Sequence, residues 1–383
     1  MSLDLPNVFP TIQPMTDEIA SRAAEADHLG KLPSEDIQAL RDSGYLTLNI
    51  PRELGGYGFN LHDCMAVHLE LAQASTSTAL VAAMQLQIFG QAGELRHWPT
   101  GKYEAFCQAA VQGGLFNHLA TEPALGSPSR GGMFMSCATP IADGWLVNGH
   151  KTWATGGRHL THLLVRLSLD DCAGEVLIYP SMPGVEWVET WGDGLSLRAS
   201  DSHDVYFHDV VIPPDHLLAR QNDKTPAPKN AWFVMTIAAT YLGTAIAARN
   251  AVIHYALERV PTALGKPIAT LPAIQRQIGE LDMHLQAAQT LLLDAAAQWN
   301  GRMDTREACY PSIVAAKQFA TETAARVTEM ALRIAGGAAL TRDLPLERYF
   351  RDVRAGFMQP PAGDTAYEIL GRSALENGAS MLG

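Results

Sequence analysis

The sequence predicts a multidomain α+β protein with an N-terminal helical domain, a middle β-barrel-like domain and a C-terminal four-helix bundle. Three observations lead to this fold class. Apolar residues recur at helical spacing from about residue 16 to 114, alternate in short runs between 133 and 211, and return to helical spacing after 231. A chain of 383 residues with 47% apolar content can bury a large core spread over two or three domains.

The first segment of the chain is predicted to be helical. Ser34 is a candidate N-cap, because Glu35 and Asp36 follow it in the first turn, where the helix dipole favours negative charge. Gly44 is placed to end that helix. The stretch from residue 51 to 58 is rich in glycine and predicts a loop, after which helical spacing resumes.

The middle segment is predicted to form strands. Residues 133–141 and 145–152 flank Asp143-Gly144, a dipeptide that favours a hairpin turn because both residues accept positive φ. Glycine, proline and aspartate separate further strands, predicted at 161–168, 175–179, 185–189 and 204–211.

The last segment is predicted to be helical almost to its end. Its apolar stripes recur every three or four residues and need partner helices, so we expect a bundle. The stretch from Gln221 to Lys229 is polar and rich in proline, which is typical of a domain boundary. We therefore predict domains at residues 1–115, 116–222 and 223–383.

The charge balance argues against nucleic-acid binding. The chain has 28 Lys and Arg against 40 Asp and Glu, a formal net charge of -12, without a long run of either sign. Phosphate backbones require a basic surface. A local basic patch would still suffice for one small anion, such as a CoA thioester.

The cysteine pattern and the apolar runs predict a cytoplasmic protein that binds no membrane. The five cysteines form no CxxC pair and are odd in number, which fits a reducing compartment. The N-terminal residues lack a basic region followed by an apolar one, and no apolar run approaches the ~18 residues of a membrane span. The sequence has no GxGxxG dinucleotide motif after a strand and no phosphate-binding Walker loop. It also lacks the HExxH metal motif, so we expect no metal.

Ordered phrases in the chain carry a family resemblance. Residues 118–127 read HLATEPALGS, residues 144–156 read GWLVNGHKTWATG, and residues 194–202 read GLSLRASDS. Further phrases at 265–275 and 345–352 follow in the same order. Together they resemble the acyl-CoA dehydrogenase family over most of the chain. The resemblance implies that fold and a FAD-dependent oxidoreductase, with FMN as an alternative cofactor.

The resemblance also implies a flavin site. A flavin that takes up hydride gains negative charge along one edge of its ring, so the protein must supply hydrogen-bond donors there. The threonines of the first two phrases are implied to contact the ring, with a tryptophan beside it and glycines at the turns. The implied cofactor-binding residues are Ala120, Thr121, Gly126, Ser127, Trp153, Thr155 and Gly337.

Two residues are implied to contact the substrate. Ser127 matches a turn near the substrate in the family. His118 takes the place of an aromatic residue that faces the flavin in many relatives. His159 and His162, in contrast, belong to no evident ligand set and are expected to be surface imidazoles.

The catalytic carboxylate of the family is missing at its usual position. Counting forward from Arg351-Asp352 without a gap puts Pro360 there, and proline cannot act as a base. The earlier helix that carries a glutamate in a minority of relatives matches residues 230–239, which contain no acid. Asp364 is a weak candidate for the base, with Glu368 nearby, and helix N-capping is the competing role for Asp364.

Two cofactor phrases also depart from the family. The arginine and phenylalanine of the phrase that reaches a neighbouring subunit's FAD are absent from residues 261–266. Arg333 replaces the glutamine that usually precedes the paired glycines. The resemblance therefore does not extend to tight binding of the adenine half of FAD, and Arg333 is a candidate contact for the pyrophosphate.

The resemblance implies α,β-dehydrogenation of an acyl-CoA thioester as the function, and two alternatives stay open. The first alternative is a flavin-dependent hydroxylase, which uses reduced flavin and oxygen and needs no carboxylate base. The second is a catalytically silent subunit or binding protein. The resemblance implies fatty acid metabolism for the dehydrogenase, and as partners an electron acceptor or a flavin reductase. It also implies a homo-oligomer, a tetramer or a dimer.

Overall fold

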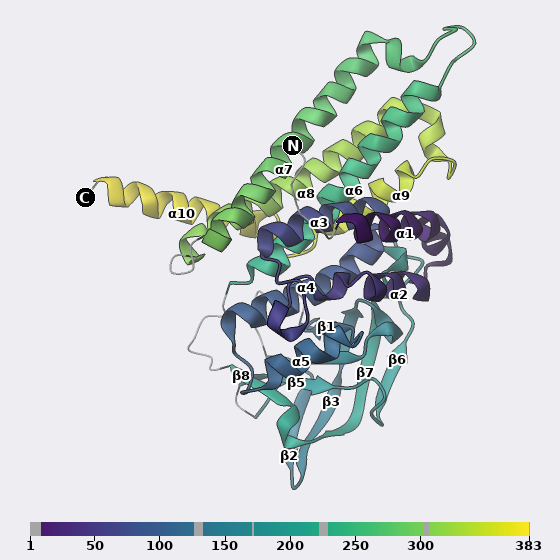
Figure 1. The fold of residues 1–383 in the computed structure, drawn as a ribbon. Helices are drawn as coiled ribbons and strands as arrows, with labels where there is room; N and C mark the ends of the chain where they lie inside the picture. Colours follow the sequence, from purple (N-terminus) through teal and green to yellow (C-terminus); the bar gives the residue numbers. More distant parts are fainter. Residues whose placement is uncertain (1–8, 126–132, 171, 222–228, 302–305, 383) are drawn as a thin grey trace.

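Helices form both ends of the chain and a sheet forms its middle. The computed structural model describes residues 9–125, 133–170, 172–221, 229–301 and 306–382. Figure 1 shows the long C-terminal helices at one end of the molecule, the sheet at the other, and the N-terminal helices between them. This arrangement confirms the fold class that the sequence predicts.

Two of the N-terminal helices, α3 and α4, begin at side chains that accept hydrogen bonds from free backbone N–H groups. Asn60 accepts a hydrogen bond from the N–H of Asp63 at the start of α3, and Ser75 accepts one from Thr78 at the start of α4. At α2 the cap residue is Pro33, whose side chain can accept no such bond, and Ser34 is already helical. The helices are α1 (Phe9–Leu29), α2 (Ser34–Asp42), α3 (Leu61–Ala74), α4 (Thr76–Leu95) and α5 (Lys102–Val111).

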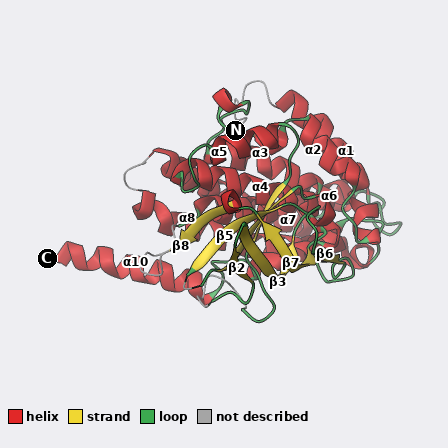
Figure 2. Cartoon of the chain, turned by 90° about the horizontal axis from the view of Figure 1, so that it is seen from below, coloured by secondary structure: helices red, strands yellow, loops and turns green. Residues whose placement is uncertain are grey.

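The middle of the chain forms one eight-stranded sheet, seen from below in Figure 2. The strands pair in the order β6-β7-β3-β2-β4-β5-β8, and β1 also pairs with β4, in parallel. The sequence prediction missed β1 and β8, which are short and flank the predicted strands. The strands are β1 (Phe116–Leu119), β2 (Cys137–Ile141), β3 (Gly144–Ala154), β4 (His162–Ser168), β5 (Ala173–Ile178), β6 (Val185–Val188), β7 (His203–Ile212) and β8 (Leu217–Gln221).

The hairpin between β2 and β3 turns one residue earlier than predicted. Ile141 pairs with Gly144, so Ala142 and Asp143 form the turn. Gly144 lies in the strand with a φ of 150°, and a Cβ atom there would meet the carbonyl oxygen of Ile212 at 2.1 Å. Close approach of β7 therefore requires this glycine.

The C-terminal helices pack around α6. This helix is buried along most of its length and contacts α7 and α8 as well as α3 and α4. The last helix, α10, packs against α8 at its start and then extends away from the rest of the molecule (Figure 1). The helices are α6 (Ala231–Glu258), α7 (Pro272–Gly301), α8 (Arg306–Ala335), α9 (Leu346–Asp352) and α10 (Asp364–Leu382), with short 3-10 turns at Gly336–Leu340 and Val353–Phe357.

By length and composition alone, α6 could cross a membrane. Of its most apolar window, 89% is buried inside the protein. Its apolar surface is therefore accounted for by packing against the neighbouring helices.

Three parts of the chain meet at Arg351 and Asp352, at the end of α9. The Arg351 guanidinium binds Asp27 of α1 at 2.7 and 3.2 Å and the carbonyl oxygen of Leu195 at 3.1 Å. Asp352 accepts a hydrogen bond of 2.7 Å from the N–H of Leu197. We call these contacts the three-domain junction, because they connect α1, the segment before β7 and the C-terminal helices.

Replacement of Arg351 by methionine is predicted to destabilise the protein by about 3 kcal/mol, because it leaves Asp27 buried without its partner. The side chains of Arg351 and Asp27 are only 12% and 10% exposed. Chemical denaturation followed by tryptophan fluorescence measures this change. Arg333→Met is the matched control: Arg333 is 72% exposed in its pair with Glu329, so the control is expected to stay within about 0.5 kcal/mol of wild type. Equal effects of the two variants would contradict the junction.

Candidate functional site

The first two phrases of the family resemblance lie side by side in the structure. The N–H of Thr152, in β3, donates a 3.0 Å hydrogen bond to the carbonyl oxygen of Thr121, just after β1. Thr121 therefore lies beside the end of β3, which carries Trp153 and leads into Thr155. Ala120 and Thr121 are half-buried.

Trp153 is exposed at an irregular point of β3. Its φ is 59°, in the left-handed region that bulky residues rarely adopt, and the β3–β7 register shifts between Lys151 and Ala154. The bulge leaves 60% of Trp153 exposed. An exposed indole on a strained backbone is a candidate contact for a ligand.

Thr155 is held from two sides by buried polar groups. Its carbonyl oxygen accepts a 2.9 Å hydrogen bond from the amide of Asn117, in β1. Its hydroxyl lies 2.9 Å from the hydroxyl of Ser202, which lies 2.7 Å from that of Ser200. Sequence reasoning missed Asn117, Ser200 and Ser202 as site residues. The serines belong to the phrase at 194–202, but only the fold shows that this phrase meets Thr155.

A buried ion pair supports this corner of the sheet. Lys151 Nζ lies 2.6 Å from Glu122 Oε1, and both side chains are almost fully buried. Burial alone would raise the pKa of Glu122, but hydrogen bonds from Lys151 and from the N–H groups of Met135 and Ser136 outweigh it and lower the pKa. Burial lowers the pKa of Lys151 to about 8, so the pair stays charged at neutral pH.

The His118 ring points to a second buried carboxylate. His118 Nε2 lies 2.7 Å from Glu175 Oε2, in β5, and the indole N–H of Trp98 donates a 2.8 Å hydrogen bond to Glu175 Oε1. Burial opposes ionisation of Glu175, but His118 and Trp98 outweigh it and lower its pKa to about 2. Because neighbouring residues of a strand point to opposite faces, His118 points away from the face on which Asn117 reaches Thr155. Its contact with substrate stays a prediction.

The loop that would carry the family's carboxylate is held by groups of other helices. Lys317, buried in α8, donates hydrogen bonds to the carbonyl oxygens of Gly356 at 3.0 Å and Gln359 at 2.8 Å. The hydroxyl of Tyr241, in α6, donates to the Gln359 side chain at 2.8 Å. Burial lowers the pKa of Lys317 to about 8. Asp364 lies past this loop, exposed, as the first residue of α10.

Of the other predicted cofactor residues, only Gly337 lies in the described part of the chain. Gly126 and Ser127 lie outside the described residues. Gly337 is exposed in the 3-10 turn after α8, and Arg333, near the end of α8, forms an ion pair with Glu329.

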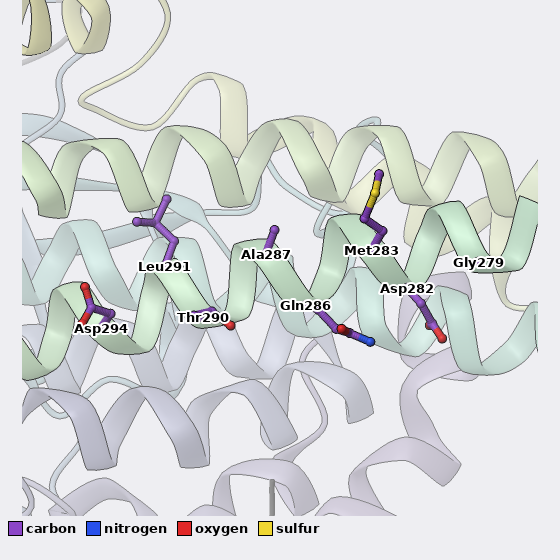
Figure 3. A pocket seen from close by; sticks show the side chains of 8 residues that line it. All are labelled: Gly279, Asp282, Met283, Gln286, Ala287, Thr290, Leu291 and Asp294. Carbon is purple, nitrogen blue, oxygen red and sulfur yellow. The ribbon is translucent and has the colours of Figure 1, made fainter.

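A separate groove runs along the outer face of α7 (Figure 3). Figure 3 shows side chains of a single helix lining it, among them the exposed Met283 and Ala287. Asp282, at one end, is bound to Arg249. No predicted site residue lies in this groove, so it is not the candidate site.

The residues around Thr121 fit a flavin ring. A flavin requires a flat apolar contact and hydrogen-bonding groups along its polar edge. Trp153 supplies an exposed flat surface, and two threonines lie beside it, Thr121 half-buried and Thr155 buried.

Family comparisons agree with the fold. The acyl-CoA dehydrogenase N-terminal domain matches residues 13–96, and the acyl-CoA dehydrogenase C-terminal domain matches residues 235–358. The chain is 35% identical over 365 residues to the putative acyl-CoA dehydrogenase YdbM of Bacillus subtilis (strain 168), and the match covers 95% of each chain.

Other similar proteins have names that do not describe acyl-CoA dehydrogenases. The chain is 28% identical over 372 residues to L-evernosamine nitrososynthase of a Micromonospora species, covering 93% of this chain and 87% of that one. A KijD3 structure in complex with FMN and dTDP-3-amino-2,3,6-trideoxy-4-keto-3-methyl-D-glucose superimposes with a TM-score of 0.83 at 27% identity. That match covers 96% of this chain and 93% of the other.

Acid is predicted to destabilise the protein through Glu175. Its pKa is about 2 in the folded state against 4.5 for an ordinary glutamate, so the ionised carboxylate stabilises the fold above pH 4.5. That contribution, about 3 kcal/mol, is lost as pH falls from 4.5 through 2. Urea denaturation of wild type and Glu175→Gln at several pH values measures it. The variant should lose less stability across this range, and parallel curves would contradict the assignment.

Proposed function

The chain belongs to the acyl-CoA dehydrogenase family, and from this premise we propose that it is a flavin-dependent monooxygenase. Reduced flavin, oxygen and an organic substrate would give oxidised flavin, water and the oxygenated substrate. The substrate is a small organic molecule of unassigned class.

The loop after α9 carries this proposal. Family dehydrogenases require a carboxylate base, and residues 353–363 contain none. Pro360 occupies the matching position, and the polar groups of Gln359 are already bound to Lys317 and Tyr241. A reaction in which oxygen, activated by reduced flavin, attacks the substrate needs no base at this position. The names of the nitrososynthase and of the FMN complex of KijD3 support chemistry other than dehydrogenation in this fold.

The chain's own residues would bind and orient the cofactor. Trp153 would pack against one face of the ring, and Thr121 and Thr155 would hydrogen-bond its polar edge. Asn117 and Ser202 keep Thr155 in place. When bound and reduced, the flavin would react with oxygen and so activate it for attack on the substrate.

The residues that would bind the nucleotide part of the flavin decide between FAD and FMN. The phrase at 261–266 lies near the turn between α6 and α7, at the end of the molecule far from the sheet (Figure 1), so it could reach a flavin only in another copy of the chain. It lacks the family's arginine, and Arg333 lies exposed near the end of α8, beside Glu329. We retain FAD as the proposed cofactor, with FMN as the alternative. Mass spectrometry of the released cofactor distinguishes them.

The proposed partners follow from this reaction. A flavin reductase would supply the reducing equivalents, and the enzyme would work in the cytoplasm as a homo-oligomer. No nucleic acid or membrane is needed.

A second candidate is acyl-CoA dehydrogenation with Asp364 as the base. Two observations favour it: the 35% identity to YdbM, and the exposed position of Asp364 directly after the loop that lacks the carboxylate. This candidate would place the chain in fatty acid metabolism.

Flavin spectra separate the candidates. The monooxygenase is predicted to keep its oxidised flavin absorbance during anaerobic addition of butyryl-, isovaleryl-, octanoyl- and palmitoyl-CoA. After chemical reduction and admission of oxygen, the bound flavin should return to the oxidised form. Bleaching by any thioester would overturn the monooxygenase proposal, and wild-type protein that binds neither FAD nor FMN would favour a silent subunit.

The same titration tests Asp364. If the flavin bleaches with a thioester, the dehydrogenase candidate predicts that Asp364→Asn slows bleaching by about a hundredfold or more, as loss of a positioned base does. Glu368→Gln, four residues further along α10, is the matched control and should retain the wild-type rate. Unchanged bleaching in Asp364→Asn would exclude this aspartate as the base.

A further inference from the structure

We infer that a cavity among the N-terminal helices binds a small organic carboxylate through Arg41. This inference goes beyond the proposed function, because none of the candidate flavin residues lines the cavity. The two can therefore be tested independently.

The cavity lies where the ends of α2 and α5 meet the glycine-rich loop at 51–58. Its volume is about 700 Å³, which falls within the range of about 300 to 1,000 Å³ that is typical of small-molecule sites. Leu46 and Ala110, both buried, and Val111, partly exposed, supply its apolar walls. Arg41 and Tyr57 supply polar groups. An apolar wall with a few polar groups is the usual composition of a ligand site.

The backbone around the cavity already has hydrogen-bond partners. The N–H groups of Gly44 and Gly113 donate to carbonyl oxygens at the ends of α2 and α5, at 3.0 and 2.9 Å. Those of Gly56 and Tyr57 donate to other carbonyl oxygens, both at 3.2 Å. These N–H groups are therefore not free to bind an anion, and a ligand must be recognised by side chains.

Arg41 presents an oriented guanidinium group without a counter-ion. Its Nε donates a 2.8 Å hydrogen bond to the carbonyl oxygen of Gly113, which joins the end of α2 to the end of α5. In the described part of the chain this is its only hydrogen bond, and no carboxylate lies within ion-pair distance of it. The two Nη groups thus keep four N–H donors, and the edge that they form matches the two oxygens of a carboxylate.

The neighbouring Asp42 does not neutralise this charge. Its carboxylate accepts a 2.7 Å hydrogen bond from the amide of Gln38, one turn earlier in α2. Asp42 is exposed, whereas Arg41 is half-buried. The positive charge of Arg41 therefore remains available to a ligand in the cavity.

Tyr57 supplies a flat wall and a second donor. Its ring lies across Gly44, where a Cβ atom would meet both the ring and its hydroxyl at 2.8 Å. Gly44 has a φ of 71°, so this turn needs glycine for its backbone as well as for the ring contact. Among the described residues the Tyr57 hydroxyl has no hydrogen-bond partner, so it can donate to a ligand oxygen.

These features favour a carboxylate over a phosphate. One guanidinium group and one hydroxyl match a planar oxyanion with a single charge, whereas a phosphate group carries up to two charges and three acceptor oxygens. The apolar walls fit a short hydrocarbon body attached to the carboxylate. The ligand is therefore a monocarboxylate with a short apolar body.

Titration of the protein as purified with hexanoate tests this inference. Saturation-transfer NMR of the ligand should show saturable binding with a dissociation constant of about 1 mM, as expected for one charge-assisted pair and a partly buried chain. Hexanamide, which has the same shape without the charge, should bind at least about tenfold more weakly. Acetate should also bind more weakly, because it lacks the methylene groups. Inorganic phosphate should bind less tightly than hexanoate.

Variants locate this binding in the cavity. Arg41→Gln should weaken hexanoate by about tenfold or more, and Arg41→Lys, which keeps the charge without the planar group, should lie between Arg41→Gln and wild type. Tyr57→Phe should weaken hexanoate by about fivefold, the factor of one hydrogen bond. Arg158→Gln is the matched control, because Arg158 is an exposed arginine of the β domain, and it should bind as wild type does.

The inference has clear ways to fail. Wild type without saturable hexanoate binding, equal binding of hexanoate and hexanamide, or unchanged hexanoate affinity in folded Arg41→Gln would each overturn the site. If circular dichroism shows that Arg41→Gln does not fold, unchanged affinity in Tyr57→Phe would overturn it instead. Tighter binding of phosphate than of hexanoate would overturn the carboxylate assignment. None of these results bears on the proposed flavin chemistry, which shares no residue with the cavity.

Discussion

The candidate site depends on the three-domain junction at Arg351 and Asp352. Asp352 accepts the N–H of Leu197, whose carbonyl oxygen accepts the N–H of Ser200. The carbonyl oxygen of Ser200 accepts the N–H of Gly156, next to Thr155. A continuous series of hydrogen bonds thus runs from the end of α9 to the residues beside the exposed Trp153. The position of Thr155 in the sheet is therefore set partly by the C-terminal helices.

Two buried carboxylates show how partners decide the charge of such a group. Glu175 interacts with His118 and accepts a hydrogen bond from Trp98, and its pKa falls to about 2. Burial raises the pKa of Asp352 to about 6, and the single N–H of Leu197 only partly offsets this. Because the folded-state pKa of Asp352 lies above its ordinary value, its contribution to stability falls as pH rises from 3.8 through 6. Near neutral pH, the hydrogen bond from Leu197 therefore offsets only part of the cost of burying the ionised Asp352. At Glu175, in contrast, the partners outweigh the cost of burial.

Much of the fold could be predicted from the sequence because its signals are local. Helical spacing identified the two helical regions, and alternation identified six of the eight strands within a few residues. The sequence placed the β2–β3 turn one residue too late, because it assigned Gly144 to the turn. Gly144 is instead needed in the strand, where the backbone of Ile212 in β7 approaches it closely, and β7 is distant in sequence. Asn117 and Ser202 could not be found in the same way, since their role depends on strands distant in sequence.

The chain departs from its family in the loop after α9, and this loop is separate from the strands that carry the candidate flavin contacts. The groups that fit a flavin ring lie on and beside β1 and β3, whereas the family's base belongs to the loop after α9. The hydrogen bonds of Lys317 and Tyr241 to that loop need backbone carbonyls and a Gln359 side chain, and no acid. The loop can therefore keep its shape without a carboxylate, and the β-domain contacts lose nothing by the change. A fold built in this way can retain a cofactor site while the chemistry carried out beside it changes.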